Sequence, residues 1–218
     1  MRTAEVDESY IPAAGHHWGL PFYDPVVKLI GGDSARRVLI EQAALQPGFR
    51  VLEVGCGTGS LLMSIKRTHP RVDVTGLDPD PKALARAQRK ADAASVTVQL
   101  DRGFSDALPY PDASFDRVFS CFMLHHLNGV EEKQQTLREI RRVLKPGGRL
   151  HLLDFAPHAE KAGGLAGRLH SHGRMADSAE SRVLTFMKDA GLAGPVTTKR
   201  AKMFFVLDIA YYQGAAPS

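Results

Sequence analysis

Gly55, Gly57 and Gly59 stand at alternate positions after an apolar run, and this spacing is typical of a turn that binds a ligand. Glycine lets the backbone take positive φ and lets a ligand approach where a Cβ atom would clash. An apolar helical pattern follows, so the free N–H groups at the start of that helix would face the same ligand. A nicotinamide-binding turn reads Gly-x-Gly-x-x-Gly, whereas the third glycine place is Ser60 here, which disfavours a nicotinamide cofactor.

Two adjacent histidines, His125 and His126, are the side chains best suited to acid–base chemistry. They follow a predicted strand, and an imidazole can act as a general base near neutral pH. A packing role, or a role at the start of a helix, is the alternative. Cys56 and Cys121 give neither a disulfide framework nor the spacing of a zinc site. We therefore place the catalytic residues among the histidines, expect the cysteines only to line the site, and expect no metal.

Alternating strands and helices would bring these residues to one edge of a sheet. The apolar patterns predict strands at 50–54, 72–77, 96–100, 115–121 and 149–154, separated by helices at 60–68, 80–93 and 131–144. Asp33 or Ser34 is the predicted cap of an earlier helix that runs to about residue 46, and Asp80, followed by Pro81, is the predicted cap of the helix 80–93. The segment 145–148 is predicted to end the helix 131–144 before the next strand. This alternation predicts a Rossmann-like, doubly wound α/β fold, in which ligands bind outside the carboxyl ends of the strands. Residues 195–200 and 204–212 are predicted to close the sheet as an antiparallel pair.

The first 32 residues are expected to form an N-terminal arm of short helices, and residues 33–218 a single domain. The arm contains Tyr10, His16, Trp18 and Tyr23, which could form a lid over a bound cofactor and substrate. A lid would exclude water from the reaction. The alternative is a helix packed on the edge of the sheet.

Composition sets limits on partners and location. The 218 residues are 44% hydrophobic and carry a formal net charge of +4, which permits an anionic substrate but does not call for nucleic acid. The chain contains no apolar run of about 18 residues that would suggest a membrane span, and its start lacks the apolar core of a secretory signal. A cytoplasmic location is expected, and the oligomeric state stays open.

Four motifs in unbroken order resemble class I S-adenosylmethionine-dependent methyltransferases. They are the segments 51–59, 76–80, 107–116 and 144–148, and the resemblance spans about residues 35–155. The group that this chain resembles most is the small-molecule methyltransferases of the ubiquinone and menaquinone biosynthesis type. That resemblance implies a seven-stranded sheet whose last strand is antiparallel.

The resemblance also implies cofactor contacts. Gly55, Gly57 and Gly59, with Cys56 between them, would pass beneath the methionine part of S-adenosylmethionine, and Glu53 would reach its amino group. Asp78 would accept hydrogen bonds from both ribose hydroxyls, Pro79 would lie beside the adenine, and Cys121 would contact the methionine part through its backbone.

One position departs from the family pattern. Many relatives carry an aspartate that binds the adenine amino group, whereas Phe104 stands at that place here. Phe104 could stack on the adenine while Ser105 or a backbone group makes the polar contact. Asp101 or Asp106 could replace the missing aspartate if the loop shifts.

These observations predict methyl transfer from S-adenosylmethionine to carbon, oxygen or nitrogen of a small-molecule acceptor, with S-adenosylhomocysteine as product. A cofactor-binding sensor or non-catalytic subunit is the alternative. The segment that follows residue 121 lacks the Pro-Pro-aromatic turn of DNA-base methylases, and two cysteines are too few for arsenic methylation. No carboxylate cluster suggests metal-assisted catechol methylation.

Overall fold

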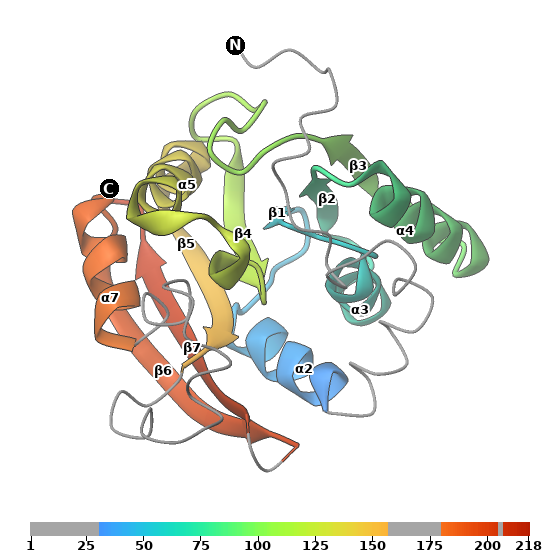
Figure 1. The fold of residues 1–218 in the computed structure, drawn as a ribbon. Helices are drawn as coiled ribbons and strands as arrows, with labels where there is room; N and C mark the ends of the chain where they lie inside the picture. Colours follow the sequence, from blue (N-terminus) through green and yellow to red (C-terminus); the bar gives the residue numbers. More distant parts are fainter. Residues whose placement is uncertain (1–30, 157–179, 205–206) are drawn as a thin grey trace.

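The computed structural model describes residues 31–156, 180–204 and 207–218. These residues form a seven-stranded sheet in the order β3-β2-β1-β4-β5-β7-β6 (Figure 1). The strands are β1 (Arg50–Val54), β2 (Asp73–Asp78), β3 (Gln99–Arg102), β4 (Phe115–Cys121), β5 (Leu144–Phe155), β6 (Ala193–Met203) and β7 (Leu207–Ala215). Strand β7 runs antiparallel to both β5 and β6, and the pairs among β1 to β5 are parallel. The doubly wound sheet with an antiparallel last strand is therefore confirmed.

Helices cover both faces of the sheet. Figure 1 shows α5 (Gly129–Val143) and α7 (Glu180–Asp189) on one face, and α2 (Gly32–Gln42), α3 (Ser60–Thr68) and α4 (Pro81–Ala93) on the other. Each face has its own apolar core. Leu137 and Phe186 belong to the core under α5 and α7, while Leu39, Leu61 and Ile65 belong to the core under α2 and α3.

The helix starts differ in how well the sequence predicted them. Asp80 caps α4 as expected, because its carboxylate accepts a 2.8 Å hydrogen bond from the N–H of Lys82 and Pro81 occupies the first turn. Helix α2 instead begins after Gly31, whose φ of 93° is left-handed. Asp33, one of the two expected caps, lies within the first turn and accepts a hydrogen bond from Arg36.

The segment 145–148 does not separate α5 from the next strand as expected. Strand β5 already begins at Leu144, which pairs with Phe115, and the register then shifts so that Arg149 pairs with Arg117. Gly147, with a φ of 73°, lies in this irregular part of the strand. The segment is therefore an irregular part of one long strand, although its Pro-Gly-Gly sequence favours a turn.

Among the described residues, no helix is long and apolar enough to cross a membrane. Within the same ranges, no group of three or more His, Cys, Asp or Glu side chains could hold a metal ion. The predicted arm at 1–32 and its lid residues lie almost wholly outside the described residues.

Candidate functional site

The glycine turn connects β1 to α3 at the carboxyl edge of the sheet. The three glycines all have left-handed φ values: 73° at Gly55, 52° at Gly57 and 74° at Gly59. A Cβ atom on Gly55 would lie 2.3 Å from Cγ of Met123, and one on Gly59 would lie 2.9 Å from Cβ of Ala87. A Cβ on Gly57 would meet no atom of the described residues within 4 Å. The first and third glycines therefore allow close packing, while the second leaves open space beside the backbone where a ligand can lie.

Asp78, the last residue of β2, is hydrogen-bonded to this turn. Its Oδ2 accepts a 2.8 Å hydrogen bond from the N–H of Gly57, and its Oδ1 accepts one of 2.9 Å from the N–H of Asp80. Burial raises the pKa of its carboxyl to about 6, against the opposing effect of these two donors. Each oxygen keeps acceptor capacity, because an ionised carboxylate offers about four lone-pair sites. The proposed ribose contact is compatible with this geometry and remains a prediction.

Glu53 lies one residue before the end of β1 and is only 3% exposed. Its Oε2 has no hydrogen-bond partner in the described part of the chain. Burial raises the pKa of this carboxyl to about 8, while the positive charge of Arg36 opposes the rise. A buried polar atom is normally paired. The unpaired oxygen beside an open glycine turn therefore fits a cationic ligand group, such as the amino group of S-adenosylmethionine.

The loop after β3 carries the residues expected near the adenine. Ser105 is hydrogen-bonded to Thr136 at 2.8 Å between the two hydroxyl oxygens. Oδ2 of Asp101 accepts hydrogen bonds from Tyr110 at 2.9 Å and from Gln99 at 2.7 Å. The side chains of Ser105 and Asp101, two of those proposed to replace the missing aspartate, thus already have protein partners. The half-buried ring of Phe104 lies on the same loop, and its stacking on the adenine stays a prediction.

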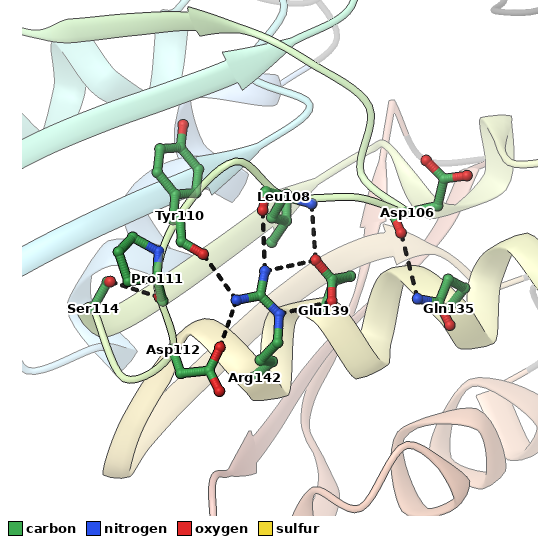
Figure 2. Close-up of polar contacts among 9 residues, drawn as sticks. All are labelled: Asp106, Leu108, Tyr110, Pro111, Asp112, Ser114, Gln135, Glu139 and Arg142. Carbon is green, nitrogen blue, oxygen red and sulfur yellow. Dashed lines mark hydrogen bonds and ion pairs between the residues drawn. The ribbon is translucent and has the colours of Figure 1, made fainter. Parts of the chain in front are cut away.

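One arginine of α5 holds the same loop by hydrogen bonds and ion pairs (Figure 2). Arg142 donates from Nη2 to the carbonyl of Leu108 at 3.0 Å and from Nη1 to the carbonyl of Tyr110 at 2.8 Å. It also pairs with Glu139 and with Asp112, both at 2.7 Å. Glu139 in turn accepts a 2.9 Å hydrogen bond from the N–H of Leu108. The 106–112 segment therefore has a defined position over α5.

His125 lies in a short 3-10 helix, η2 (Leu124–His126), directly after β4. Its Nδ1 is 2.6 Å from Oδ1 of Asp154, and its backbone N–H donates to Oδ2 of the same carboxylate at 3.1 Å. Asp154 is 1% exposed and lies near the end of β5, with Oδ1 also accepting from the N–H of Phe155 at 2.8 Å. The ring of Phe155 packs edge-on against His125, with 4.9 Å between centroids.

The sequence interpretation missed Asp154. A signal in the sequence could have revealed it, because Asp154 is an acidic residue at the carboxyl end of a predicted strand. Asp78 has the same kind of position at the end of β2. Its partnership with His125 was hidden because the two lie 29 positions apart in the chain and only the parallel pairing of β4 with β5 brings them together.

His126 packs beside His125, and the two cysteines line the site as protonated thiols. The ring of His126 lies beside that of His125, with centroids 4.1 Å apart, and its backbone N–H donates to the carbonyl of Met123. Burial raises the pKa of the Cys121 thiol to about 12 and raises that of Cys56 as well. Both thiols are therefore protonated at neutral pH, which agrees with the expectation that neither is a nucleophile.

Arg36 is a further side chain at this edge that the sequence interpretation missed. It is 6% exposed, and its charge acts on both Glu53 and Cys121. The residues of the expected lid, Tyr10, His16, Trp18 and Tyr23, lie outside the described residues, so the structure neither supports nor contradicts that role.

Comparison with known proteins identifies the type of domain. A family model described as "Methyltransferase domain" matches residues 51–148. The chain is 34% identical over 174 residues to a demethylmenaquinone methyltransferase of Deinococcus radiodurans, covering 77% of this chain and 70% of that protein. It is 37% identical over 153 residues to the enzyme of that name from Thermus thermophilus, covering 69% of this chain and 68% of that protein.

Solved structures agree on the fold. The crystal structure of the [4+2]-cyclase SpnF superimposes with a TM-score of 0.70 at 20% identity, covering 85% of this chain and 80% of that one. A likeness at this identity concerns the architecture alone, and SpnF is by name a cyclase rather than a transferase. The reaction must therefore be argued from the site and from the more similar relatives.

Proposed function

This chain belongs to the S-adenosylmethionine-dependent methyltransferases, and from that premise we propose that it methylates a small acceptor whose reacting group must lose a proton to His125. Methyl transfer to a small molecule, with S-adenosylmethionine as cofactor, follows from the family. The role of His125 and the chemical class of the acceptor are the proposal. A hydroxylated aromatic ring, such as the reduced form of a quinone, is the acceptor class that we favour.

The contact between His125 and Asp154 is the observation that carries this proposal. A carboxylate accepts hydrogen bonds, so Nδ1 at 2.6 Å carries the proton and Nε2 is left with a lone pair. No described residue makes a hydrogen bond to Nε2. Asp154 thus acts as a positioning residue that sets the tautomer and would stabilise the imidazolium formed when Nε2 accepts a proton.

The other site residues have binding roles in this proposal. When bound, S-adenosylmethionine supplies a methyl group activated by a positively charged sulfur. Glu53 would hold its amino group, the open side of Gly57 would lie along its methionine part, and Asp78 would accept from its ribose. Phe104 would stack on its adenine. These contacts would align the donor and acceptor for in-line transfer, which is the main contribution of the protein to such a reaction.

The acceptor class is supported by two considerations. The name demethylmenaquinone methyltransferase, borne by both relatives described above, points to a quinone-related acceptor. Methylation of a hydroquinone, at oxygen or at ring carbon, requires loss of a proton that a neutral imidazole can accept. A cytoplasmic location and the absence of a nucleic-acid partner stay predictions.

The first test measures binding and turnover. Titration calorimetry with S-adenosylhomocysteine should give micromolar binding, and incubation with S-adenosylmethionine and a panel of hydroquinones, phenols and amines should give methylated hydroquinone or phenol by mass spectrometry. Binding without turnover of any acceptor would favour the alternative of a cofactor-binding sensor or subunit. Methylation confined to amines would contradict the proposed acceptor class.

The second test concerns the base. His125→Asn should lower kcat by about 100-fold or more while the affinity for S-adenosylhomocysteine stays within about twofold. Asp154→Asn should give a smaller loss of kcat, because it removes the charge that would stabilise the imidazolium and leaves the base itself in place. His126→Asn is the matched control, and we expect it to lose less than about tenfold. Equal losses in both histidine variants would contradict the assignment of the base to His125.

A further inference from the structure

The segment that joins β6 to β7 is apolar, and two of its side chains are exposed. Residues 203–207, here called the hairpin tip, read Met-Phe-Phe-Val-Leu, and residues 205 and 206 lie outside the described residues. Phe204 is 60% exposed and Leu207 is 39% exposed. Among the described residues, Phe204 has the largest exposed fraction of any large hydrophobic side chain. Connections between strands are normally polar or rich in glycine and proline, so this segment indicates an apolar binding partner.

The backbone of Phe204 gives a second reason to assign its ring a function. Its φ of 48° lies in the left-handed region, where most residues with a Cβ atom are disfavoured and glycine, asparagine and aspartate are favoured. The ring gains little burial in exchange, because Phe204 is exposed. Both costs would be offset if the ring entered an apolar phase.

The hairpin tip lies at the edge of the sheet that holds the candidate site. The last residue of β5, Phe155, pairs with Ile209 of β7, and the N–H of Ala156 donates to the carbonyl of Asp208 at 2.9 Å. Strands β6 and β7 therefore extend past the end of β5 (Figure 1). Asp154, which positions the proposed base, is next to Phe155 on β5. A surface that bound the hairpin tip would thus lie along the same edge of the sheet as the proposed base.

Basic side chains adjoin the hairpin tip. Lys199, Arg200 and Lys202 are all exposed on β6. Arg200 pairs with Glu180 and Lys202 pairs with Asp208, so two of these charges are partly neutralised. Lys199 makes no ion pair with a described residue. An apolar tip flanked by cations is complementary to an anionic lipid surface, because the acyl region accepts apolar side chains and the phosphate groups attract the cations.

We propose that the hairpin tip docks on an anionic phospholipid bilayer, with the side chains of Phe204 and Leu207 in the interfacial region and Lys199 near the phosphate groups. So small an apolar surface gives weak, reversible attachment rather than a permanent anchor. The attachment itself does not depend on the proposed function. Its consequence does, because the edge of the sheet would face the lipid and an apolar hydroquinone dissolved there could reach the site without crossing water.

Co-sedimentation with vesicles tests the attachment. The wild-type protein should bind vesicles of phosphatidylglycerol and phosphatidylcholine at least about tenfold more strongly than vesicles of phosphatidylcholine alone, and added salt should weaken this binding. Phe204→Asn should lower the partition coefficient on the mixed vesicles by about tenfold. Lys199→Gln should lower it by about fivefold. Asparagine suits the left-handed φ at this position, so Phe204→Asn should be at least as resistant to urea as the wild type.

Val196→Asn is the matched control, because Val196 is 49% exposed on the same strand but lies near its other end. It should bind the mixed vesicles as the wild type does. Equal losses in Val196→Asn and Phe204→Asn would overturn the inference, as would failure of the wild-type protein to bind the mixed vesicles. Equal binding of the wild type to both kinds of vesicle would contradict the anionic surface.

Two other occupants of the hairpin tip would give different results. If a second copy of the chain covered it, sedimentation equilibrium without lipid would show a dimer that Phe204→Asn dissociates. If the acceptor itself met the tip, Phe204→Asn would slow methylation of a water-soluble hydroquinone as much as that of a lipid-dissolved one. Either result would overturn the inference. Failure of the wild type to methylate both acceptors would instead contradict the proposed function, and vesicle binding would still decide the inference.

Discussion

At the scale of single residues, we expect Glu53 to couple cofactor binding to the release of a proton. Because burial raises the pKa of its carboxyl to about 8, Glu53 is mostly protonated at pH 7 in the ligand-free protein. An ammonium placed beside it would stabilise the charged form and lower that pKa. We therefore expect close to one proton to be released for each cofactor bound at pH 7, and less at pH 9, where Glu53 is already ionised.

Calorimetry in two buffers with different ionisation enthalpies measures this release as a difference in the observed binding enthalpy. Glu53→Gln is the control, because the amide has a similar shape and cannot titrate, and its binding enthalpy should not depend on the buffer. A wild-type enthalpy that is the same in both buffers would show that Glu53 does not change its charge when the cofactor binds.

Gly55 and Gly57 should respond differently to replacement by alanine. Gly57→Ala adds a methyl group in open space at a φ of 52°, so we expect a cost of about 1 kcal/mol in unfolding free energy and a large loss of cofactor affinity. Gly55→Ala adds a methyl group 2.3 Å from Met123 and should cost more in stability. Urea unfolding and calorimetry on both variants test this. The reverse order of stabilities would contradict the assignment of Gly57 to the ligand side.

Individual site residues were predictable where the signal is local. The glycine turn, Asp78 and His125 could be found because each stands within a few residues of a strand end. Asp154 could not be found, because its role depends on a contact with His125 that only the folded sheet creates. An arginine in the predicted helix 33–46 is ordinary by sequence, and only its burial makes it notable.

At the scale of elements, Arg142 should control the position of the loop after β3. Arg142→Met keeps much of the side-chain volume but removes the donors to Leu108 and Tyr110 and leaves Glu139 without its cation (Figure 2). We expect a loss of about 2 kcal/mol in unfolding free energy. Cofactor affinity should also fall several-fold, because the same loop carries Phe104. Urea unfolding and calorimetry measure the two effects.

Arg138→Met is the matched control on the same helix. Arg138 is exposed, and it donates hydrogen bonds to Gln134 and Gln135, which belong to α5 itself. Its replacement should change the unfolding free energy by less than about 0.5 kcal/mol. Similar losses in the two variants would mean that the loop is positioned by packing rather than by the arginine.

Element boundaries were predictable where capping is local and not where pairing is distant. Helix α4 could be located because Asp80 and Pro81 specify its start within two residues. Strand β5 was expected at 149–154 but spans Leu144–Phe155, because pairing with β4 and β7 extends the strand through a Pro-Gly-Gly segment that favours a turn. Strand β3 was expected at 96–100 and is Gln99–Arg102, since pairing with β2 decides its extent.

For the molecule as a whole, the sheet separates two apolar cores, one on each of its faces. From the sequence alone, these cores could be predicted only as apolar faces of the individual helices and strands. His151 lies on β5 and is 1% exposed, and neither of its ring nitrogens is hydrogen-bonded to a described residue. Its ring stacks on Phe119 with centroids 5.5 Å apart. Burial, reinforced by the charges of Arg117 and Arg149, lowers its pKa from 6.5 to about 3. His151 is therefore neutral in the folded protein at physiological pH.

This burial should make the fold sensitive to acid. The unfolded chain binds a proton at this histidine below pH 6.5 while the folded protein does not until about pH 3, so stability is retained above pH 6.5 and lost as the pH falls. Between pH 8 and pH 5 the loss from His151 alone should be about 2 kcal/mol. Glu53 and Asp78 act in the opposite direction, because their pKa values are raised on folding and their contribution is lost as the pH rises.

Comparison with His151→Leu isolates the histidine, because the two carboxyls are present in both proteins. The leucine variant should be at least as stable as the wild type at pH 8, since it removes two unpaired buried nitrogens, and its advantage should grow by about 2 kcal/mol at pH 5. Phe119→Leu is the control, because it alters the same contact without a titrating group and should cost the same at both pH values. Urea unfolding at the two pH values measures each difference. An advantage of His151→Leu that does not change with pH would show that the folded protein protonates His151 as readily as the unfolded chain does.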